Sequence, residues 1–266
     1  MKANGSKGGN WFETLPGTNA GALKLFCFPH AGGSSQIFRG WQQYLSPEIA
    51  LCLSHLPGRG MRIGERPFTN IKALVAGLAD ALAPQVQRPF SFWGHSMGAL
   101  ISFELARELR RRNQPGPLVL LVSGRGAPHC RDAGPPKSSL PDSEFLTKLR
   151  ELQGTPEELL TSPDLRAFFL PMIRADFELV ETYAFEPARL LECPIFAYGG
   201  FEDKHVTPQA LAGWKQHTVQ SASCKVRMFP GGHFFLQDRI SDMAQLLRLD
   251  ILEVLARAEN SFALYQ

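Results

Sequence analysis

The feature that most constrains this chain is the stretch of residues 90–100, which reads FSFWGHSMGAL. An apolar, aromatic run ends at Gly94, a Gly-x-Ser-x-Gly pattern is centred on Ser96, and a long helical pattern begins directly after it. Between a strand and a helix this pattern predicts a nucleophile elbow, a tight and strained turn that exposes the serine hydroxyl at the carboxyl edge of a sheet. We expect a side chain at Gly94 or Gly98 to collide with the neighbouring strand or helix.

Apolar runs typical of strands alternate with helical patterns along the rest of the chain. We expect strands at 23–28, 49–56, 89–94, 118–122, 195–198 and 224–229. We expect helices at about 35–45, 70–82, 97–112, 207–217 and 239–258. Because the strands are continuously apolar and helices separate them, the pattern predicts an α/β fold with a mostly parallel central sheet covered by helices on both faces.

The block between about 141 and 186 carries only helical patterns, with breaks near Pro156 and Pro163. No strand pattern interrupts this block, so it predicts a helical insertion. We therefore expect one domain at 21–266 with a helical lid insertion at about 129–187. Residues 1–20, whose first ten are rich in Gly, Lys and Asn, predict a flexible N-terminal tail and a loop that leads into the first strand.

Composition excludes several classes of protein. The formal net charge of +3 over 266 residues is too small to favour nucleic acid as a partner. No apolar run approaches the ~20 residues that cross a bilayer, and the amino terminus lacks the apolar core of a secretory signal. The five cysteines include no C-x-x-C pair, which favours small buried side chains in a reducing compartment. We expect a cytoplasmic protein with no nucleic-acid or membrane partner and, since no metal-ligand spacing or phosphate-loop motif occurs, no metal or cofactor.

Arginine is concentrated in two places, at residues 107–112 near the end of one expected helix and at 59–66 in one expected loop. Basic residues at the end of a helix complement its macrodipole, and loop arginines are commonly solvated, so a structural role explains both clusters. A docking surface for an acidic partner is the alternative, and the sequence leaves both interpretations open.

A serine nucleophile needs an imidazole to take its proton and a carboxylate to orient that imidazole. After a nucleophile elbow, the expected order along the chain is the acid and then the histidine. Asp203 follows the expected strand 195–198 and two turn glycines, so it is the first choice for the acid. Glu202 beside it and Asp132, which follows the preceding strand, are alternatives.

The base is expected in the loop after the last strand, where His233 follows a Gly-Gly turn. The six other histidines do not fit this position. His95 lies inside the elbow, where we expect it to pack and to form local hydrogen bonds. His30 ends the first expected strand, where it could hold the loop that follows.

Acyl transfer also needs two backbone N–H groups that point at the developing oxyanion. Met97 supplies one at the amino end of its helix, where the helix dipole strengthens the effect. The segment 30–33, His-Ala-Gly-Gly, resembles the HGGG-type loop of esterases, and Ala31 is expected to supply the other. The expected catalytic residues are Ser96, Asp203 and His233, with Ala31 and Met97 as the oxyanion hole.

Several strings together resemble the type II thioesterases, the editing enzymes that accompany nonribosomal peptide and polyketide synthases. They cover about residues 22–240: FPHAGG at 28–33 with Phe38 and Trp41, LPGRGMR at 56–62, GHSMGA at 94–99, FELAR at 103–107, SGRGAP at 123–128, and RADF at 174–177 with Tyr183. The chain departs from the pattern at Gly60, where the family usually carries Glu.

The resemblance implies the α/β-hydrolase fold with a helical lid. It implies, as substrates, water and an acyl thioester on the phosphopantetheine arm of an acyl or peptidyl carrier protein. It also implies a hydrolase of secondary metabolism, as in antibiotic or siderophore biosynthesis, that removes stalled or wrong acyl groups. The apolar lid residues divide between the lid's own core and an acyl channel, and no substrate-binding residue is assigned. The alternatives are a small-molecule carboxylesterase with the same triad, a chain-terminating thioesterase, and a non-catalytic binding protein on the hydrolase fold.

Overall fold

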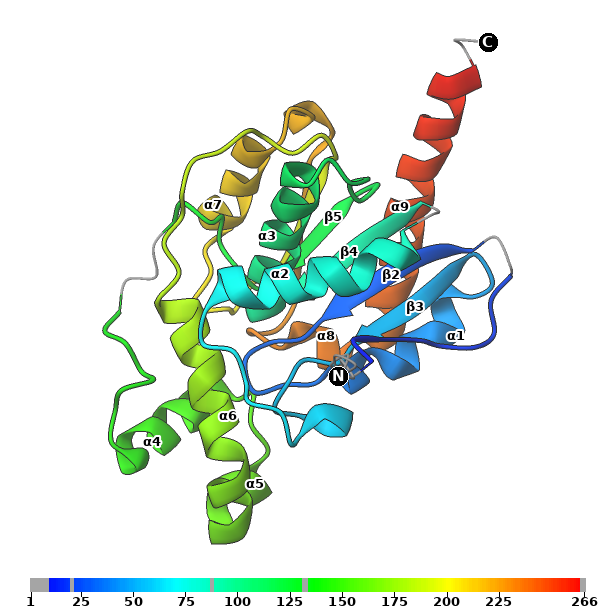
Figure 1. Cartoon of the computed structure of the whole chain (residues 1–266). Coiled ribbons are helices and arrows are strands. Elements are labelled where there is room, and N and C mark those ends of the chain that lie inside the picture. Colours follow the sequence, from blue (N-terminus) through cyan, green and yellow to red (C-terminus); the bar gives the residue numbers. More distant parts are fainter. Residues whose placement is uncertain (1–9, 20–21, 87–88, 131–133, 264–266) are drawn as a thin grey trace, which may run out of the picture.

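The computed structural model describes residues 10–19, 22–86, 89–130 and 134–263. The strands within these ranges are β1 (Phe12–Thr14), β2 (Leu23–Phe28), β3 (Ile49–Ser54), β4 (Phe90–His95), β5 (Leu120–Ser123), β6 (Ile195–Gly200) and β7 (Lys225–Phe229). They form one seven-stranded sheet in the order β1-β3-β2-β4-β5-β6-β7. β1 runs antiparallel to β3 and every other neighbouring pair is parallel, which confirms the predicted mostly parallel sheet (Figure 1).

Helices cover both faces of the sheet, as predicted. α2 (Ile71–Leu82) and α3 (Met97–Arg111) pack on one face, and α1 (Gln42–Leu45) and α9 (Ile240–Ala263) pack on the other (Figure 1). Successive side chains of a strand point to opposite faces, so Phe92 packs with α2 and α3 whereas Trp93 packs with α1 and α9. Burial on both faces fixes the central strand β4 and the turn at its carboxyl end.

Local sequence explains the ends of the two helices that flank β4. The side chain of Asn70 accepts a hydrogen bond from the N–H of Ala73 and so caps the start of α2. α3 ends shortly before Asn113, whose φ of 54° lies in the left-handed region that commonly terminates a helix.

The block between β5 and β6 is helical and contains α4 (Asp142–Leu152), α5 (Glu157–Thr161) and α6 (Pro163–Glu181). The breaks fall where the prolines predict them, since Pro156 precedes α5 and Pro163 is the first residue of α6. These helices stand beside one end of the sheet (Figure 1) and bury a separate apolar cluster, which includes Phe145, Leu149, Leu160 and Ile173. All three lie within the predicted insertion at about 129–187, while the division of the chain into tail, domain and lid stays a prediction.

The amino-terminal segment differs from its prediction. Residues 12–14 lie in the predicted tail and loop, but they form β1, in which Phe12 is paired with Ser54 of β3. The ring of Phe12 is buried against Phe26 and Phe28, so this apolar contact holds the segment on the edge of the sheet. Residues 1–9 of the predicted tail lie outside the described residues.

The segment 35–45 is predicted as one helix, but it forms the 3₁₀ helix η1 (Ser35–Trp41) followed by α1. Phe38 and Trp41 are both fully buried, and the three-residue repeat of a 3₁₀ helix puts both side chains on the same side.

The remaining helices of the described chain are short: η2 (Gly60–Arg62), η3 (Ala83–Gln85), α7 (Pro208–Ala212), η4 (Gly213–His217), η5 (Ser221–Ser223) and α8 (Phe235–Asp238). Within the ranges that the structure describes, no helix has the length and apolar character needed to cross a membrane.

Candidate active site

Ser96 lies between β4 and α3, in the turn that the sequence predicts. Its backbone has φ 55° and ψ −110°, a conformation that costs a non-glycine residue about 1–3 kcal/mol. The N–H of Ser96 donates a hydrogen bond of 2.7 Å to the carbonyl oxygen of Ser123 at the end of β5. The elbow is therefore strained and is held in place by the neighbouring strand.

The two glycines of the elbow are required by their surroundings. A Cβ at Gly94 would lie 2.1 Å from the carbonyl oxygen of Gly98, and a Cβ at Gly98 would lie 2.0 Å from the carbonyl oxygen of Phe28. These are backbone atoms, so no side-chain rotation relieves either contact. The predicted collisions are confirmed, and β2, β4 and α3 meet this closely because both side chains are absent.

Asp203 and His233 form a hydrogen-bonded pair beyond the carboxyl ends of β6 and β7. Nδ1 of His233 lies 2.7 Å from Oδ2 of Asp203, and the N–H of His205 donates to Oδ1 at 2.8 Å. The side chain of Asp203 is fully buried, whereas Glu202 is exposed. Asp132, the other alternative, lies outside the described residues. Of the two candidates that the structure describes, Asp203 is the one that bonds the histidine.

Backbone contacts hold the acid loop against the base loop. The N–H of Phe201 donates to the carbonyl oxygen of Phe229 at 2.8 Å, and the N–H of Glu202 donates to that of Gly231 at 3.0 Å. A Cβ at Gly200 would lie 2.3 Å from the carbonyl oxygen of Gly231. The glycine at position 200 therefore allows the two loops to approach and the two side chains to meet.

Two opposing effects act on the pKa of Asp203. Burial raises it, but the hydrogen bond and the charge of His233 lower it more, so the pKa lies below its ordinary value. The carboxyl group is therefore ionised at neutral pH and accepts the Nδ1 proton of His233. This hydrogen bond fixes the tautomer in which Nε2 carries the lone pair.

Two buried histidines, His30 and His95, lie near His233. The ring centroids of His95 and His233 are 5.0 Å apart, and those of His30 and His95 are 6.1 Å apart. Burial, together with the nearby His233, lowers the pKa of His30 to about 4 and the pKa of His95 well below its ordinary range. Both rings are therefore neutral near pH 7 and add no positive charge beside His233.

The end of β5 supports the site, and sequence reasoning missed its role. Oγ of Ser123 lies 2.9 Å from Nδ1 of His95, which is the local hydrogen bond expected for that histidine. Gly124 has φ 58°, and a Cβ there would lie 2.5 Å from Cε1 of His95 and 3.3 Å from Cε1 of His233. The available signal was the Ser-Gly pair directly after an apolar strand.

The loop His30–Gly33 passes close to the first turn of α3. The carbonyl oxygen of Pro29 lies 2.9 Å from the position that a Cβ on Gly98 would take, and Ala31 packs against the core that contains Met97. The loop turns tightly, since the N–H of Gly33 donates to the carbonyl oxygen of His30 at 3.0 Å. Ala31 therefore lies in a compact turn, two residues after the contact that Pro29 makes with the first turn of α3.

The lid reaches this region at two points. A Cβ at Gly32 would lie 3.3 Å from Cγ1 of Ile173 in α6, and a Cβ at Gly154 would lie 2.3 Å from the ring of Phe234. Gly154 joins α4 to α5, and Phe234 directly follows His233. The lid therefore contacts both the loop after β2 and the loop after β7.

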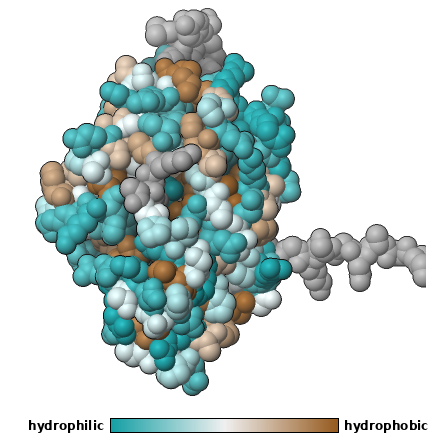
Figure 2. All heavy atoms as spheres, turned by 90° about the vertical axis from the view of Figure 1, so that its left-hand side faces the viewer, coloured by the Kyte–Doolittle hydropathy of each residue, from teal (hydrophilic) through white to brown (hydrophobic). Residues whose placement is uncertain are grey.

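The apolar side chains of the lid lie partly in its core and partly on its surface. Phe145 is fully buried in the lid cluster, whereas Phe168 is 58% exposed. On the side of the molecule that lies to the left in Figure 1, Figure 2 shows apolar side chains scattered among hydrophilic ones. No acyl channel follows from this distribution alone.

The arginine clusters form ion pairs within the chain. In the first cluster, Arg107 pairs with Glu104, Arg110 with Glu192, Arg111 with Glu108, and Arg112 with Glu108 and Asp80. In the second, the buried Arg59 and Arg62 pair with Asp176 and Glu65. These partners favour the structural interpretation of both clusters over a docking surface.

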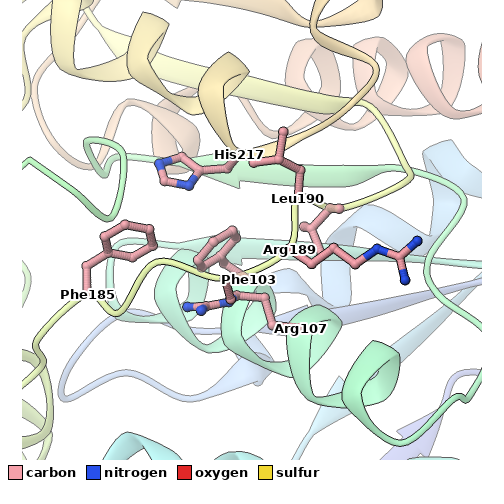
Figure 3. Close-up of a pocket in the computed structure, with 8 residues that line it drawn as sticks. Phe103, Arg107, Phe185, Arg189, Leu190 and His217 are labelled. Atoms are coloured by element: carbon pink, nitrogen blue, oxygen red, sulfur yellow. The ribbon is translucent and has the colours of Figure 1, made fainter.

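A small hollow lies on the outer part of α3 (Figure 3). Phe103 and Arg107 of α3 line it together with Phe185, Arg189 and His217. Its lining includes none of Ser96, Asp203 and His233, so it is separate from the candidate active site.

The family model of the thioesterase domain matches residues 23–249, which include the elbow, the acid and the base. The chain belongs to this thioesterase family. The sequence is 41% identical over 246 residues to the gramicidin S biosynthesis protein GrsT of Aneurinibacillus migulanus, covering 92% of this chain and 95% of that protein. It is 35% identical over 234 residues to the thioesterase PikA5 of Streptomyces venezuelae, covering 87% of this chain and 82% of that protein.

A solved structure has the same architecture as this thioesterase. The type II thioesterase BorB from the borrelidin biosynthetic cluster superimposes with a TM-score of 0.81 at 32% identity, covering 93% of this chain and 100% of that chain. These similarities confirm the predicted resemblance to type II thioesterases and the predicted α/β-hydrolase fold.

Proposed function

We propose that this thioesterase is a serine hydrolase that removes acyl groups from the phosphopantetheine arm of carrier proteins. Its role is to clear stalled or wrong acyl groups during nonribosomal peptide or polyketide biosynthesis. The hydrogen bond between His233 and Asp203, next to the strained elbow at Ser96, carries the proposal. The similarity to GrsT, PikA5 and BorB supports the class of pathway.

Acylation is the first proposed step. Oγ of Ser96 attacks the thioester carbonyl while Nε2 of His233 takes its proton, and the Asp203 carboxylate stabilises the imidazolium that forms. The N–H groups of Met97 and Ala31 donate to the oxyanion of the tetrahedral intermediate. The intermediate collapses by breaking its C–S bond, the thiol leaves with the proton from His233, and the acyl group remains as an ester on Ser96.

Deacylation repeats the same chemistry with water. His233 takes a proton from a water molecule, which attacks the ester carbonyl, and the same two N–H groups hold the second oxyanion. Collapse breaks the bond to Oγ of Ser96, which regains its proton from His233, and the carboxylic acid departs. A thiolate is a good leaving group, so protonation by His233 is less demanding in the first step than in a peptidase.

The proposed partner is an acyl or peptidyl carrier protein, and the proposed compartment is the cytoplasm. The cysteines support a reducing compartment because Cys27, Cys52 and Cys193 are buried thiols without disulfide bonds. Burial raises the pKa of Cys193 to about 12 and that of Cys52 to about 11, so these thiols are unreactive packing groups. The mechanism uses no metal or other cofactor.

The decisive comparison is between a carrier-bound thioester and an oxygen ester of the same acid. We expect kcat/KM to favour the thioester by at least about tenfold, because the proposed partner supplies contacts that a small ester lacks. Higher kcat/KM for the oxygen ester would favour a carboxylesterase. Failure of a fluorophosphonate to label Ser96 would favour a non-catalytic binding protein.

A further inference from the structure

Arg59 and Asp176 come from distant parts of the chain and form a buried ion pair. They are separated by 117 positions, Arg59 in the loop after β3 and Asp176 in the lid helix α6. Nη1 and Nη2 of Arg59 donate to Oδ2 and Oδ1 of Asp176 at 2.7 and 2.6 Å. Both side chains are less than a tenth exposed. This two-point geometry fixes the direction of both groups as well as their distance.

The same two side chains hold the loop that follows β2. Oδ2 of Asp176 accepts a hydrogen bond of 2.7 Å from the N–H of Gly32, and Nη1 of Arg59 donates to the carbonyl oxygen of Gly33 at 2.9 Å. Gly32 directly follows Ala31 and has φ +79°. Asp176 therefore anchors the peptide unit between Ala31 and Gly32, and Arg59 anchors the carbonyl of Gly33, two peptide units further along the chain.

The lid helix adds a packing contact to these hydrogen bonds. Ile173 lies about one turn before Asp176 in α6, and its Cγ1 is 3.3 Å from the position that a Cβ on Gly32 would take. Two side chains of α6 thus contact the same glycine, one by a charged hydrogen bond and one by packing.

Stability alone does not explain this arrangement. Replacing a buried ion pair by apolar side chains of similar volume is often neutral or stabilising, because two charges lose their hydration on burial. The pair differs from an apolar pair in its directed bonds to the backbone of Gly32 and Gly33. Catalytic groups need to be held within about 0.5 Å of their productive position, which directed bonds achieve.

We propose that Arg59 and Asp176 are positioning residues of the oxyanion hole, which hold the N–H of Ala31 in line with the N–H of Met97. The inference rests on the role proposed above for Ala31. Neither side chain contacts the reacting atoms in this mechanism. In this proposal the lid helix α6 supports the loop that forms the oxyanion hole, in addition to lying over it.

The first test replaces one partner. Asp176→Asn keeps the size of the side chain but removes the charge that holds Arg59, so the loop loses part of its anchor. We expect kcat on an acyl-pantetheine thioester to fall about 10- to 100-fold, less than the roughly 10²- to 10³-fold effect of deleting an oxyanion donor. KM should change less than about threefold. Arg59→Lys, which keeps the charge but lacks the two-point geometry, should show an intermediate loss.

The second test separates position from stability. The double variant Arg59→Met/Asp176→Leu replaces both charges by apolar side chains, so we expect it to unfold near the wild-type temperature. Its kcat should still be about as low as that of Asp176→Asn, because the hydrogen bonds to Gly32 and Gly33 are absent. Recovery of wild-type kcat in this double variant would overturn the proposal and leave the pair a merely structural one.

A matched control is available on the other side of the sheet. Asp250 is 1% exposed and accepts hydrogen bonds from Tyr198 and Arg227, so it is also a buried carboxylate paired with arginine. Asp250→Asn should lower the unfolding temperature and leave kcat unchanged. If kcat fell as much in Asp250→Asn as in Asp176→Asn, lower stability would explain both losses, and the proposal would be overturned.

The rate at which a fluorophosphonate labels Ser96 separates this inference from the proposed substrate. Phosphonylation also develops negative charge in the oxyanion hole, and it requires no thioester. Suppose that the wild-type protein cleaves no thioester and that the fluorophosphonate labels Asp176→Asn more slowly than the wild type. This result would support the positioning role of Asp176 and refute the proposed thioester substrate. Suppose instead that the wild type cleaves the thioester and that every Arg59 and Asp176 variant keeps the wild-type kcat and labelling rate. This result would refute the positioning role and support the proposed substrate.

Discussion

Nδ1 of His233 lies 2.7 Å from Oδ2 of Asp203, and the side chain of Asp203 is fully buried. Asp203→Asn removes the charge that stabilises the imidazolium and allows the wrong tautomer of His233. We expect kcat for thioester hydrolysis to fall about 10³- to 10⁴-fold, in line with the same change in a serine protease triad. Steady-state kinetics measure the effect, with Glu202→Gln as the neighbouring exposed control. Equal losses in both variants would reject Asp203 as the acid.

Gly98 meets the end of β2 so closely that it tolerates no side chain. A Cβ there would lie 2.0 Å from the carbonyl oxygen of Phe28, so Gly98→Ala forces α3 away from the sheet. We expect a loss of more than about 3 kcal/mol in the free energy of unfolding, measured by urea denaturation. Gly116 has open space around its Cβ position, so Gly116→Ala should stay within about 0.5 kcal/mol of wild type. A stable Gly98→Ala protein would contradict the geometry of the elbow.

The strain at Ser96 is measurable without catalysis. Ser96→Ala and Ser96→Gly both lack the nucleophile and should show no turnover. Glycine adopts φ 55° without strain, so we expect Ser96→Gly to be more stable than Ser96→Ala by about 1 kcal/mol, after the entropy of glycine in the unfolded chain is included. Chemical denaturation of the two proteins gives the difference. Greater stability of the alanine variant would mean that the turn is not strained.

Buried histidines make the stability depend on pH. Burial, with the adjacent His129, lowers the pKa of His217 from 6.5 to about 4. Between these values the unfolded chain binds a proton that the folded chain does not, so the free energy of unfolding falls as the pH falls from 6.5 towards 4. This histidine alone should cost about 2 kcal/mol between pH 7 and pH 5. His217→Gln should lose correspondingly less stability over that interval, and an unchanged slope would contradict the assignment.

The strong periodic patterns of the sequence were sufficient to predict the sheet and its main helices. The strands β2 to β6 are mostly apolar because both faces of the sheet are covered, and this composition is visible in the sequence. β1 has three residues, and it forms because Phe12 pairs with Ser54 on a distant strand. The 3₁₀ geometry of residues 35–41 likewise follows from tertiary burial of Phe38 and Trp41 rather than from local propensity.

The candidate site likewise contains some residues that the sequence predicts and others that only the folded structure brings together. Ser96, Asp203 and His233 could be proposed from their order and from the strand ends that precede them. Ser123 and Gly124 lie at the end of β5, and the Ser-Gly pair after an apolar run was their one signal in the sequence. The contacts of Asp176 with Arg59 and Gly32 join segments more than a hundred positions apart, which no local pattern reveals.

The most direct measurement uses the intact mass of carrier proteins loaded with acetyl, medium-chain acyl or aminoacyl groups. Incubation with the wild-type protein should return at least one of these carriers to the mass of its unloaded phosphopantetheine form, and incubation with Ser96→Ala should return none. Two results would contradict a serine thioesterase that acts on carrier proteins. One is that every carrier keeps its acyl group in the presence of the wild-type protein, and the other is that carriers lose their acyl groups in the presence of Ser96→Ala.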